Sequence, residues 1–215
     1  MEAPATPPDA LDSPEAAGAP PDYGLLVLSD SPALYLRFGA DEPEFARDET
    51  ARRDGSYVGA VSLIEDGPAG TDGGAVLLDG ENAYVSVADN RFLKLGEAFT
   101  LEAWIRPGAI GEEQRLLHKG PGWALLHLTA DGVVRFGKSA SGTIATSSLA
   151  ISDTSDWHHL VAIKDGDQAH IFVDGVDVTN FVENHAIENT NADLNVGCTT
   201  FGENHFTGAV DEVAI

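Results

Sequence analysis

Cysteine is nearly absent from the chain, and so are long apolar runs. Cys198 is the single cysteine among 215 residues, which excludes an intramolecular disulfide framework and zinc sites built on several thiolates. No run of 18 apolar residues occurs, so no transmembrane helix is expected. The first residues, MEAPATPPDALDSPEAAGAPPDYG, have neither a basic start nor an apolar stretch, so we expect no signal peptide. Export would then require another route, such as lysis or assembly into a particle.

Basic residues are also scarce. Twelve Lys and Arg stand against 35 Asp and Glu, which gives a net charge of −23. Nucleic acids and anionic membrane surfaces are therefore disfavoured as partners, because phosphate contacts need clustered Lys and Arg. Such acidity suits divalent cations, but it also fits a solvated acidic surface or a salt-adapted source.

Residues 1–22 differ in composition from the rest and predict an extended N-terminal arm. The segment 1–21 has four acidic residues and no basic one, and it cannot bury enough apolar surface to offset its ordering entropy. Two interpretations stay open: a linker, or an arm that orders on a partner protein. The prolines of this predicted docking arm are Pro4, Pro7, Pro8, Pro14, Pro20 and Pro21.

From residue 23 to 215 the pattern predicts one all-β domain. After LLVLSDSP (25–32), a short helical turn or strand, come apolar runs of four to eight residues separated by Gly, Asp or Asn. This spacing is typical of an antiparallel, two-sheet, jelly-roll-like sandwich. Asp-Gly pairs at 131–132, 165–166 and 174–175 supply the positive φ angles of tight hairpins.

Two adjacent histidines, His158 and His159, raise the question of a metal or acid–base site. Strand alternation puts them on opposite faces of one strand, so they cannot both bind one metal without a bulge. The remaining five histidines are scattered and show no ligand spacing. We therefore expect structural roles, with one of the two rings hydrogen-bonded across strands, because a half-buried imidazole needs a partner.

Several blocks of the sequence resemble one known family. FTLEAWIRP (99–107), WHHLVAIKDGDQAHIFVDGV (157–176) and FTGAVDEVAI (206–215) follow in the family's order. Together they look like the laminin G-like domain of the concanavalin A-like lectin/glucanase superfamily. The resemblance implies a jelly-roll-like sandwich. Residues 23–42, with their Leu-x-Asp-x-Pro-x-x-Tyr-x-Arg line, are similar to the opening of such modules in structural proteins of tailed phages.

Part of that superfamily cleaves glycans, so glycoside hydrolysis is the first catalytic activity to consider. Glycoside hydrolysis needs two carboxylates flanking the scissile bond, and the Glu-x-Asp-x-x-Glu type of run that glucanase members use is missing. Asp211 and Glu212 are adjacent and would point to opposite faces of a strand. A Gly-x-Ser-x-Gly motif is missing too, and Cys198 is expected to be an unreactive residue that packs in the core. The expectation is that the chain is not an enzyme.

Two kinds of binding site remain as predictions. The resemblance implies calcium at the sandwich rim, with Asp48 and Asp211 as the ligands, and the alternative is that both carboxylates cap turns. Glycan binding needs exposed aromatic rings, for which Tyr57, Tyr84 and Phe201 are the candidates.

These features lead to a hypothesis with two rivals. The leading one is an outward-facing surface protein of a virion, namely a capsid decoration, fibre or minor tail component. It would dock on protein partners through its arm and adhere to glycans or cell surfaces. One rival is a glycan-binding adhesion module of a larger bacterial protein, extracellular or on the cell surface, and the other is a glycoside hydrolase. The sequence leaves homo-oligomerisation open.

Overall fold

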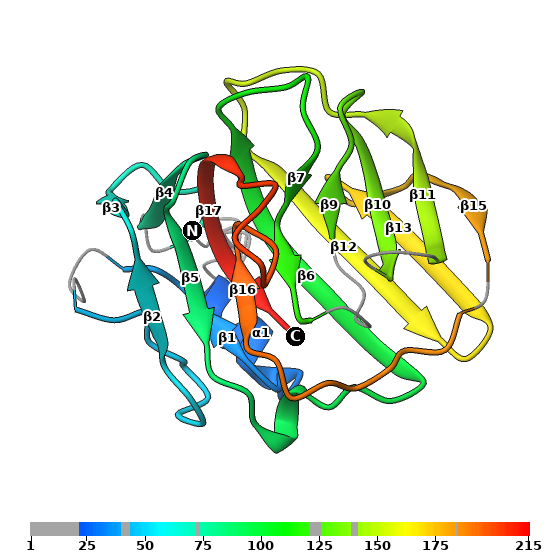
Figure 1. The fold of residues 1–215 in the computed structure, drawn as a ribbon, viewed down its shortest axis with the longest axis horizontal. Helices are drawn as coiled ribbons and strands as arrows, with labels where there is room; N and C mark the ends of the chain where they lie inside the picture. The colour runs from blue at the N-terminus through cyan, green and yellow to red at the C-terminus, as the bar shows by residue number, and fades with distance from the viewer. Residues whose placement is uncertain (1–21, 40–43, 72–73, 121–125, 139–141, 184) are drawn as a thin grey trace, which may run out of the picture.

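The computed structural model describes residues 22–39, 44–71, 74–120, 126–138, 142–183 and 185–215. The predicted arm prolines, Pro4 to Pro21, lie outside these residues. In chain order the elements are α1 (Tyr23–Ser29), β1 (Tyr35–Leu36), β2 (Gly55–Val58), β3 (Ser62–Ile64), β4 (Ala75–Asp79), β5 (Tyr84–Val87), η1 (Arg91–Leu93), β6 (Ala98–Pro107), β7 (Gln114–Arg115), β8 (Leu117–His118), β9 (His127–Leu128), β10 (Val133–Lys138), β11 (Gly142–Ala150), β12 (His158–Asp165), β13 (Gln168–Val173), β14 (Val176–Asp177), β15 (Thr179–Val182), β16 (Leu194–Val196) and β17 (Thr207–Ala214). The predicted all-β antiparallel sandwich is confirmed (Figure 1).

One large sheet, here called the back sheet, forms the first layer. Its strand order is β14-β13-β12-β6-β17-β4-β3, and β1 also pairs with β17. β6 and β12 pair without interruption from His158 opposite Ile105 to Asp165 opposite Ala98. The hairpin from β13 to β14 turns at Asp174 and Gly175, which both have positive φ, as a two-residue turn requires.

Two smaller sheets form the second layer, here called the front layer. Their orders are β2-β5-β16-β8 and β15-β11-β10-β9-β7, and in Figure 1 their strands are drawn across the back sheet. The segment 114–118 joins them, because β7 pairs with β9 while β8, two residues later, pairs with β16. The backbone N–H groups of Leu116 and Leu117 both donate to the Leu126 carbonyl, so the strand is irregular at this junction.

The hydrophobic core lies between the two layers. From the back sheet it takes alternate residues such as Leu101 and Leu160, and from the front layer it takes Val85, Val134 and Phe136, all fully buried. Burying an aliphatic or aromatic side chain of this size stabilises the fold by roughly 1.5–3 kcal/mol. Because core residues alternate with outward ones, the core fixes which side chains the front layer presents to solvent.

The helix α1 packs on the outer face of the back sheet. The Asp22 carboxylate caps it by accepting from the Leu25 amide. Gly24 and Val27 are buried, whereas Leu25 and Leu26 are exposed. No helix of the described residues is long and apolar enough to cross a membrane.

A bulge interrupts β17 near its end. Asp211 lies opposite Trp104, but the next partner pair is Ala214 opposite Glu102, and the register shifts between them. Glu212 takes a positive φ of 51° inside this shift, a conformation that is uncommon for residues with a Cβ. The bulge departs from regular alternation, and it leaves both Asp211 and Glu212 buried.

Candidate functional site

A row of five side chains crosses the outward face of the front layer. Arg115, His127, Arg135, Thr146 and Phe181 are successive cross-strand partners on β7, β9, β10, β11 and β15. Partners directly opposite in an antiparallel pair share one face of the sheet. Chain neighbours such as Leu128, Val134, Phe136 and Ala145 belong to the core, so this front-face row points out.

The row changes from covered to open along its length. Arg115 and His127 are 7% and 5% exposed, whereas Phe181 at the other end is 46% exposed. The Glu113 carboxylate lies 2.5 Å from Arg115 Nη1 and 3.8 Å from His127 Nε2. Arg135 makes no ion pair with any described residue, and its Nε is buried without a hydrogen-bond partner there. The arrangement offers donors and an apolar ring side by side, as saccharides require.

A second polar row continues the same face on the other small sheet. Ser86, Asn195 and His118 are cross-strand partners there. The loop 199–205 folds over them, since Asn195 Nδ2 donates to the Thr199 carbonyl (3.1 Å) and the Thr200 amide donates to His118 Nδ1 (3.1 Å). Burial, together with repulsion from Arg115, lowers the pKa of His118 to about 4. His118 therefore works as a neutral acceptor that holds the loop.

The three predicted ligand-binding aromatics have separate positions. Phe201, at the tip of loop 199–205, is 71% exposed, and the Tyr84 ring lies 6.2 Å from the His205 ring, beside the same loop. Tyr57 lies opposite Val85 and packs against the core. Tyr84 and Phe201 thus border the front face, whereas the Tyr57 ring is directed into the sandwich.

The predicted calcium ligands lie apart and have different surroundings. The Asp48 carboxylate accepts from the amides of Tyr35, Thr50, Arg52 and Arg53. These donors use the lone pairs a cation would need, so Asp48 fits the role of a loop cap.

Asp211 has a different environment. Thr71 Oγ1 lies 3.5 Å from its Oδ2, and its buried Oδ1 has no hydrogen-bond partner among the described residues. Burial and repulsion from Glu212 raise the pKa of Asp211 to about 8. The described residues contain no group of three or more His, Cys, Asp or Glu that could hold a metal. Calcium binding by Asp48 and Asp211 stays a prediction.

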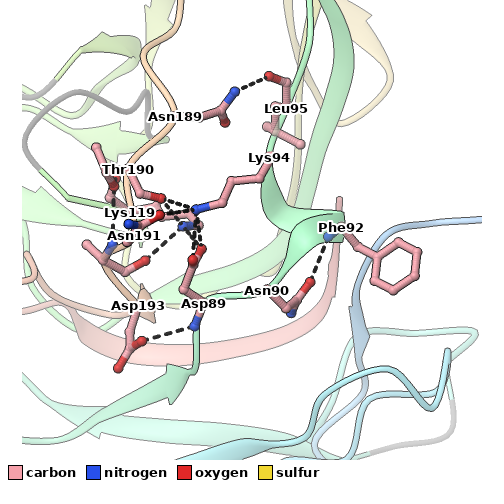
Figure 2. Close-up of polar contacts among 11 residues, drawn as sticks. Asp89, Asn90, Phe92, Lys94, Leu95, Lys119, Asn189, Thr190, Asn191 and Asp193 are labelled. Atoms are coloured by element: carbon pink, nitrogen blue, oxygen red, sulfur yellow. Dashed lines mark hydrogen bonds and ion pairs between the residues drawn. The ribbon is translucent and has the colours of Figure 1, made fainter.

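Two lysines, Lys94 and Lys119, meet at the carboxylate of Asp89 beside the loop 188–193 (Figure 2). The Lys119 ammonium is buried; it pairs with the Asp89 carboxylate and donates to the carbonyls of Thr190 (3.1 Å) and Ala192 (2.8 Å). Lys94 binds the two Asp89 oxygens at 2.9 and 2.7 Å and also contacts the Thr190 carbonyl. This lysine clamp, formed by Asp89, Lys94 and Lys119, fixes the loop 188–193 that leads into β16.

The adjacent histidines of the sequence serve two networks on the back sheet. His159 Nε2 lies 2.8 Å from Glu102 Oε1, and Tyr23 of α1 donates to the same carboxylate at 2.5 Å. His158 instead lies between Asp153 (3.0 Å) and Asp174 (2.9 Å). The predicted separation of the two rings onto opposite faces agrees with this geometry.

The outer face of the back sheet also carries carboxylates that could take part in acid–base chemistry. Glu212 accepts from the Tyr35 hydroxyl and pairs with Arg37 at 3.2 Å. A hollow of about 500 Å³ borders Glu102 and α1. Burial of Glu102 raises its pKa, but hydrogen bonds with His159 and Tyr23 outweigh burial and hold the pKa below its usual value. These partners keep the carboxylate ionised and tie α1 to the sheet.

Sequence reasoning missed the front-face row and the lysine clamp. Alternation within GVVRFGK marks Arg135 as an outward residue, so that signal was available. Arg115 and His127 belong to strands of two residues, which show no period. The single cysteine, Cys198, is buried, and burial raises the pKa of its thiol to about 11, in keeping with the predicted packing role.

Comparison with known proteins identifies the fold in both sequence and structure. The laminin G-type family model described as "Concanavalin A-like lectin/glucanases superfamily" matches residues 79–215. No curated protein matches the chain by sequence.

Among solved structures, domain 4 of AbnA, a GH43 extracellular arabinanase from Geobacillus stearothermophilus in complex with arabinotriose, aligns with a TM-score of 0.66 and 16% identity, over 85% of this chain and 90% of that domain. The binding domain of botulinum neurotoxin DC in complex with SialylT aligns with a TM-score of 0.63 and 10% identity, over 86% of this chain and 47% of that chain. Trypanosoma rangeli sialidase in complex with sialic acid aligns with a TM-score of 0.59 and 16% identity, over 84% of this chain and 30% of that chain.

These structures correct one prediction. The sequence led to the expectation that the chain is not an enzyme, yet its structural neighbours include part of an arabinanase and part of a sialidase. The fold therefore occurs within glycoside hydrolases, and the lack of a glucanase motif does not exclude that class. At these identities the likeness shows the fold alone.

Proposed function

Because the chain belongs to the concanavalin A-like lectin/glucanases superfamily, we propose that it binds carbohydrate on the outward face of its front layer. The observation that carries the proposal is the front-face row, where arginine, histidine and threonine side chains lead to an exposed phenylalanine. Sugars bind where hydrogen-bonding groups lie next to an apolar ring that can cover a sugar face. Neighbours solved with arabinotriose and SialylT support this ligand class.

A glycan array followed by calorimetry on the hits tests this function. Phe181→Ala should weaken binding about tenfold, or ~1.4 kcal/mol, because the ring is the exposed apolar end of the row. Phe92→Ala is the matched control, since Phe92 is an exposed phenylalanine (38%) that belongs to η1 and not to a strand of the row. No binding to any glycan, or equal losses in the two variants, would contradict the proposal.

Hydrolysis is measured on the same panel, because glycoside hydrolases share the fold. Release of reducing ends from a bound glycan would place the chain among the enzymes of the superfamily. A hydrolase that loses activity with Glu102→Gln, but not with Phe181→Ala, would locate the chemistry on the back sheet.

For the biological setting, we propose an outward-facing component of a tailed-phage particle. The similarity of residues 23–42 to the opening of phage modules supports it, as does the predicted arm, which would dock on protein partners of the particle. The alternative setting is an extracellular or cell-surface adhesion module. Immunogold microscopy of assembled particles distinguishes the two, and label found only on cells would overturn the virion setting.

A further inference from the structure

Arg135 is unusual among the cations of this acidic chain. Among the described Lys and Arg residues that are buried or partly buried, all but Arg135 have a side-chain nitrogen within 4.0 Å of a carboxylate. Those paired side chains are Arg37, Lys94, Arg106, Arg115, Lys119 and Lys164. With 35 acidic residues in the chain, a half-buried guanidinium that pairs with none of the described ones requires an explanation.

The two cross-strand neighbours of Arg135 provide no carboxylate. Its cross-strand partners in the front-face row are His127 and Thr146, and neither carries a negative charge at neutral pH. Its Nε is buried without a hydrogen-bond partner among the described residues. A buried donor left without an acceptor destabilises the fold, and a ligand carboxylate at the guanidinium would supply the charge partner that the described residues lack.

The rest of the row fits the ring of a sugar that brings such an acceptor. Thr146 offers a hydroxyl on the next strand, and Phe181 offers an exposed ring on the strand after it. Arg115 lies two strands from Arg135 on the other side, at roughly 10 Å from strand spacing, and it already pairs with Glu113. One anionic group at Arg135, with the sugar ring extending over Thr146 to Phe181, would use the open end of the row.

We infer that the front face selects saccharides carrying a carboxylate, and that Arg135 binds this carboxylate. This inference rests on the proposed carbohydrate binding and names its ligand class. The guanidinium presents planar paired donors that match the two oxygens of a carboxylate. The partly buried position strengthens the pairing, because solvent screens it less than at an open surface.

Matched pairs of saccharides test the selection. Oligogalacturonate is compared with its methyl ester, and 3′-sialyllactose with its methyl ester, so that each pair differs in the charge of the carboxylate and the two pairs separate uronic from sialic acids. A sulfated oligosaccharide serves as a third probe, since it carries an anion of different geometry. Wild-type protein should bind one carboxylate form at least tenfold more tightly than its neutral partner.

Three variants locate the effect. Arg135→Gln should weaken binding of the acidic form about 10–100-fold, as expected for a hydrogen bond to a charged group, and leave the neutral form within about threefold. Arg135→Lys keeps the charge without the planar fork and should fall between. Arg106→Gln is the control, because Arg106 lies on β6 of the back sheet, where it pairs with Asp66 and is not part of the front-face row. Thermal unfolding of each variant verifies that it is folded.

The failures of the two proposals are distinguishable. Binding of neutral glycans that Phe181→Ala weakens, without preference for the carboxylate form, would overturn the inference and leave carbohydrate binding intact. Equal binding of sulfated and carboxylated probes would overturn the carboxylate assignment. No glycan binding at all would overturn both.

Discussion

The position of His158 in β12 determines which side chains its ring can contact. Burial lowers its pKa, but hydrogen bonds to Asp174 and Asp153 outweigh burial and hold the pKa above its usual value. Hydrogen bonds from the Asp156 amide, followed by those from His158 and Ser155, lower the pKa of Asp153. The imidazolium therefore ties the loop before β12 to the turn after β13. His159, one residue along, contributes to a different face.

This pairing predicts a pH dependence of stability. Because the pKa of His158 is higher in the folded state than the ordinary value of about 6.5, its contribution is complete below pH 6.5 and is lost as pH rises through the folded pKa. Wild-type protein should exceed His158→Gln in free energy of unfolding by about 1 kcal/mol at pH 6. At pH 9 the difference should be smaller. Urea denaturation at both pH values measures it.

His170 provides the control for this prediction. It pairs with Asp177 at 3.0 Å on the neighbouring strand, but both side chains are 45% exposed, so solvent screens the pair. His170→Gln should change stability less than His158→Gln at pH 6. A His158→Gln difference that grows between pH 6 and pH 9 would contradict the assignment.

At the scale of elements, the lysine clamp determines where the loop 188–193 lies. Lys119 follows β8 directly, and its side chain is 0% exposed, whereas that of Lys94 is 30% exposed. Burial lowers the pKa of Lys119, and the hydrogen bond to Asp89 only partly offsets this. The clamp thus keeps the charged Lys119 buried, and its hydrogen bonds hold the loop 188–193, which contains no strand (Figure 2).

Removing the two lysines separately should have unequal effects. Lys119→Met should lower the free energy of unfolding by about 2–4 kcal/mol, because it takes the donor from two carbonyls and one charge from a buried pair. Lys94→Met should cost about 1 kcal/mol, since that side chain is partly solvated. Denaturant titration gives the totals, and amide exchange of residues 189–193 localises the effect. Equal losses, or faster exchange elsewhere only, would contradict this role.

Elements with a clear period could be predicted from the sequence, and those without one could not. In β6 and β12, eight consecutive residue pairs keep strict alternation, and Asp174-Gly175 forms the turn its chemistry demands. In the front layer, irregular register near Val133 and Phe136 changes which residues face out, and β7, β8 and β9 have two residues each. The candidate site depends on these irregular strands, so its residues were found only in the structure.

The bulge in β17 explains why the surroundings of Asp211 and Glu212 could not be predicted from the sequence. Alternation predicts opposite faces for Asp211 and Glu212, yet the register shift buries both. Glu212 then meets Tyr35 and Arg37, residues at the other end of the chain. Contacts over such sequence separations follow from tertiary packing, which no local pattern encodes.

At the scale of the whole molecule, charge opposes folding. A net charge of −23 on 215 residues makes the compact state repel itself, and salt screens this repulsion beyond about 10 Å at 0.1 M. Most acidic side chains lie outside the buried pairs, so screening should relieve more repulsion than it removes attraction. The folded state should therefore gain stability with salt.

Raising NaCl from about 20 to 500 mM should increase the Tm by about 3 °C, equivalent to ~1 kcal/mol for a domain of this size. A Tm that falls with NaCl would contradict a net stabilisation by charge screening.

CaCl₂ at equal ionic strength tests the predicted calcium ligands, because a cation that binds only the folded state stabilises it further by mass action. If Asp211 is a ligand, Asp211→Asn should abolish the extra rise with calcium and keep the rise with NaCl. Asp48→Asn should lower the Tm in both salts, because it removes the acceptor that caps the loop 48–53.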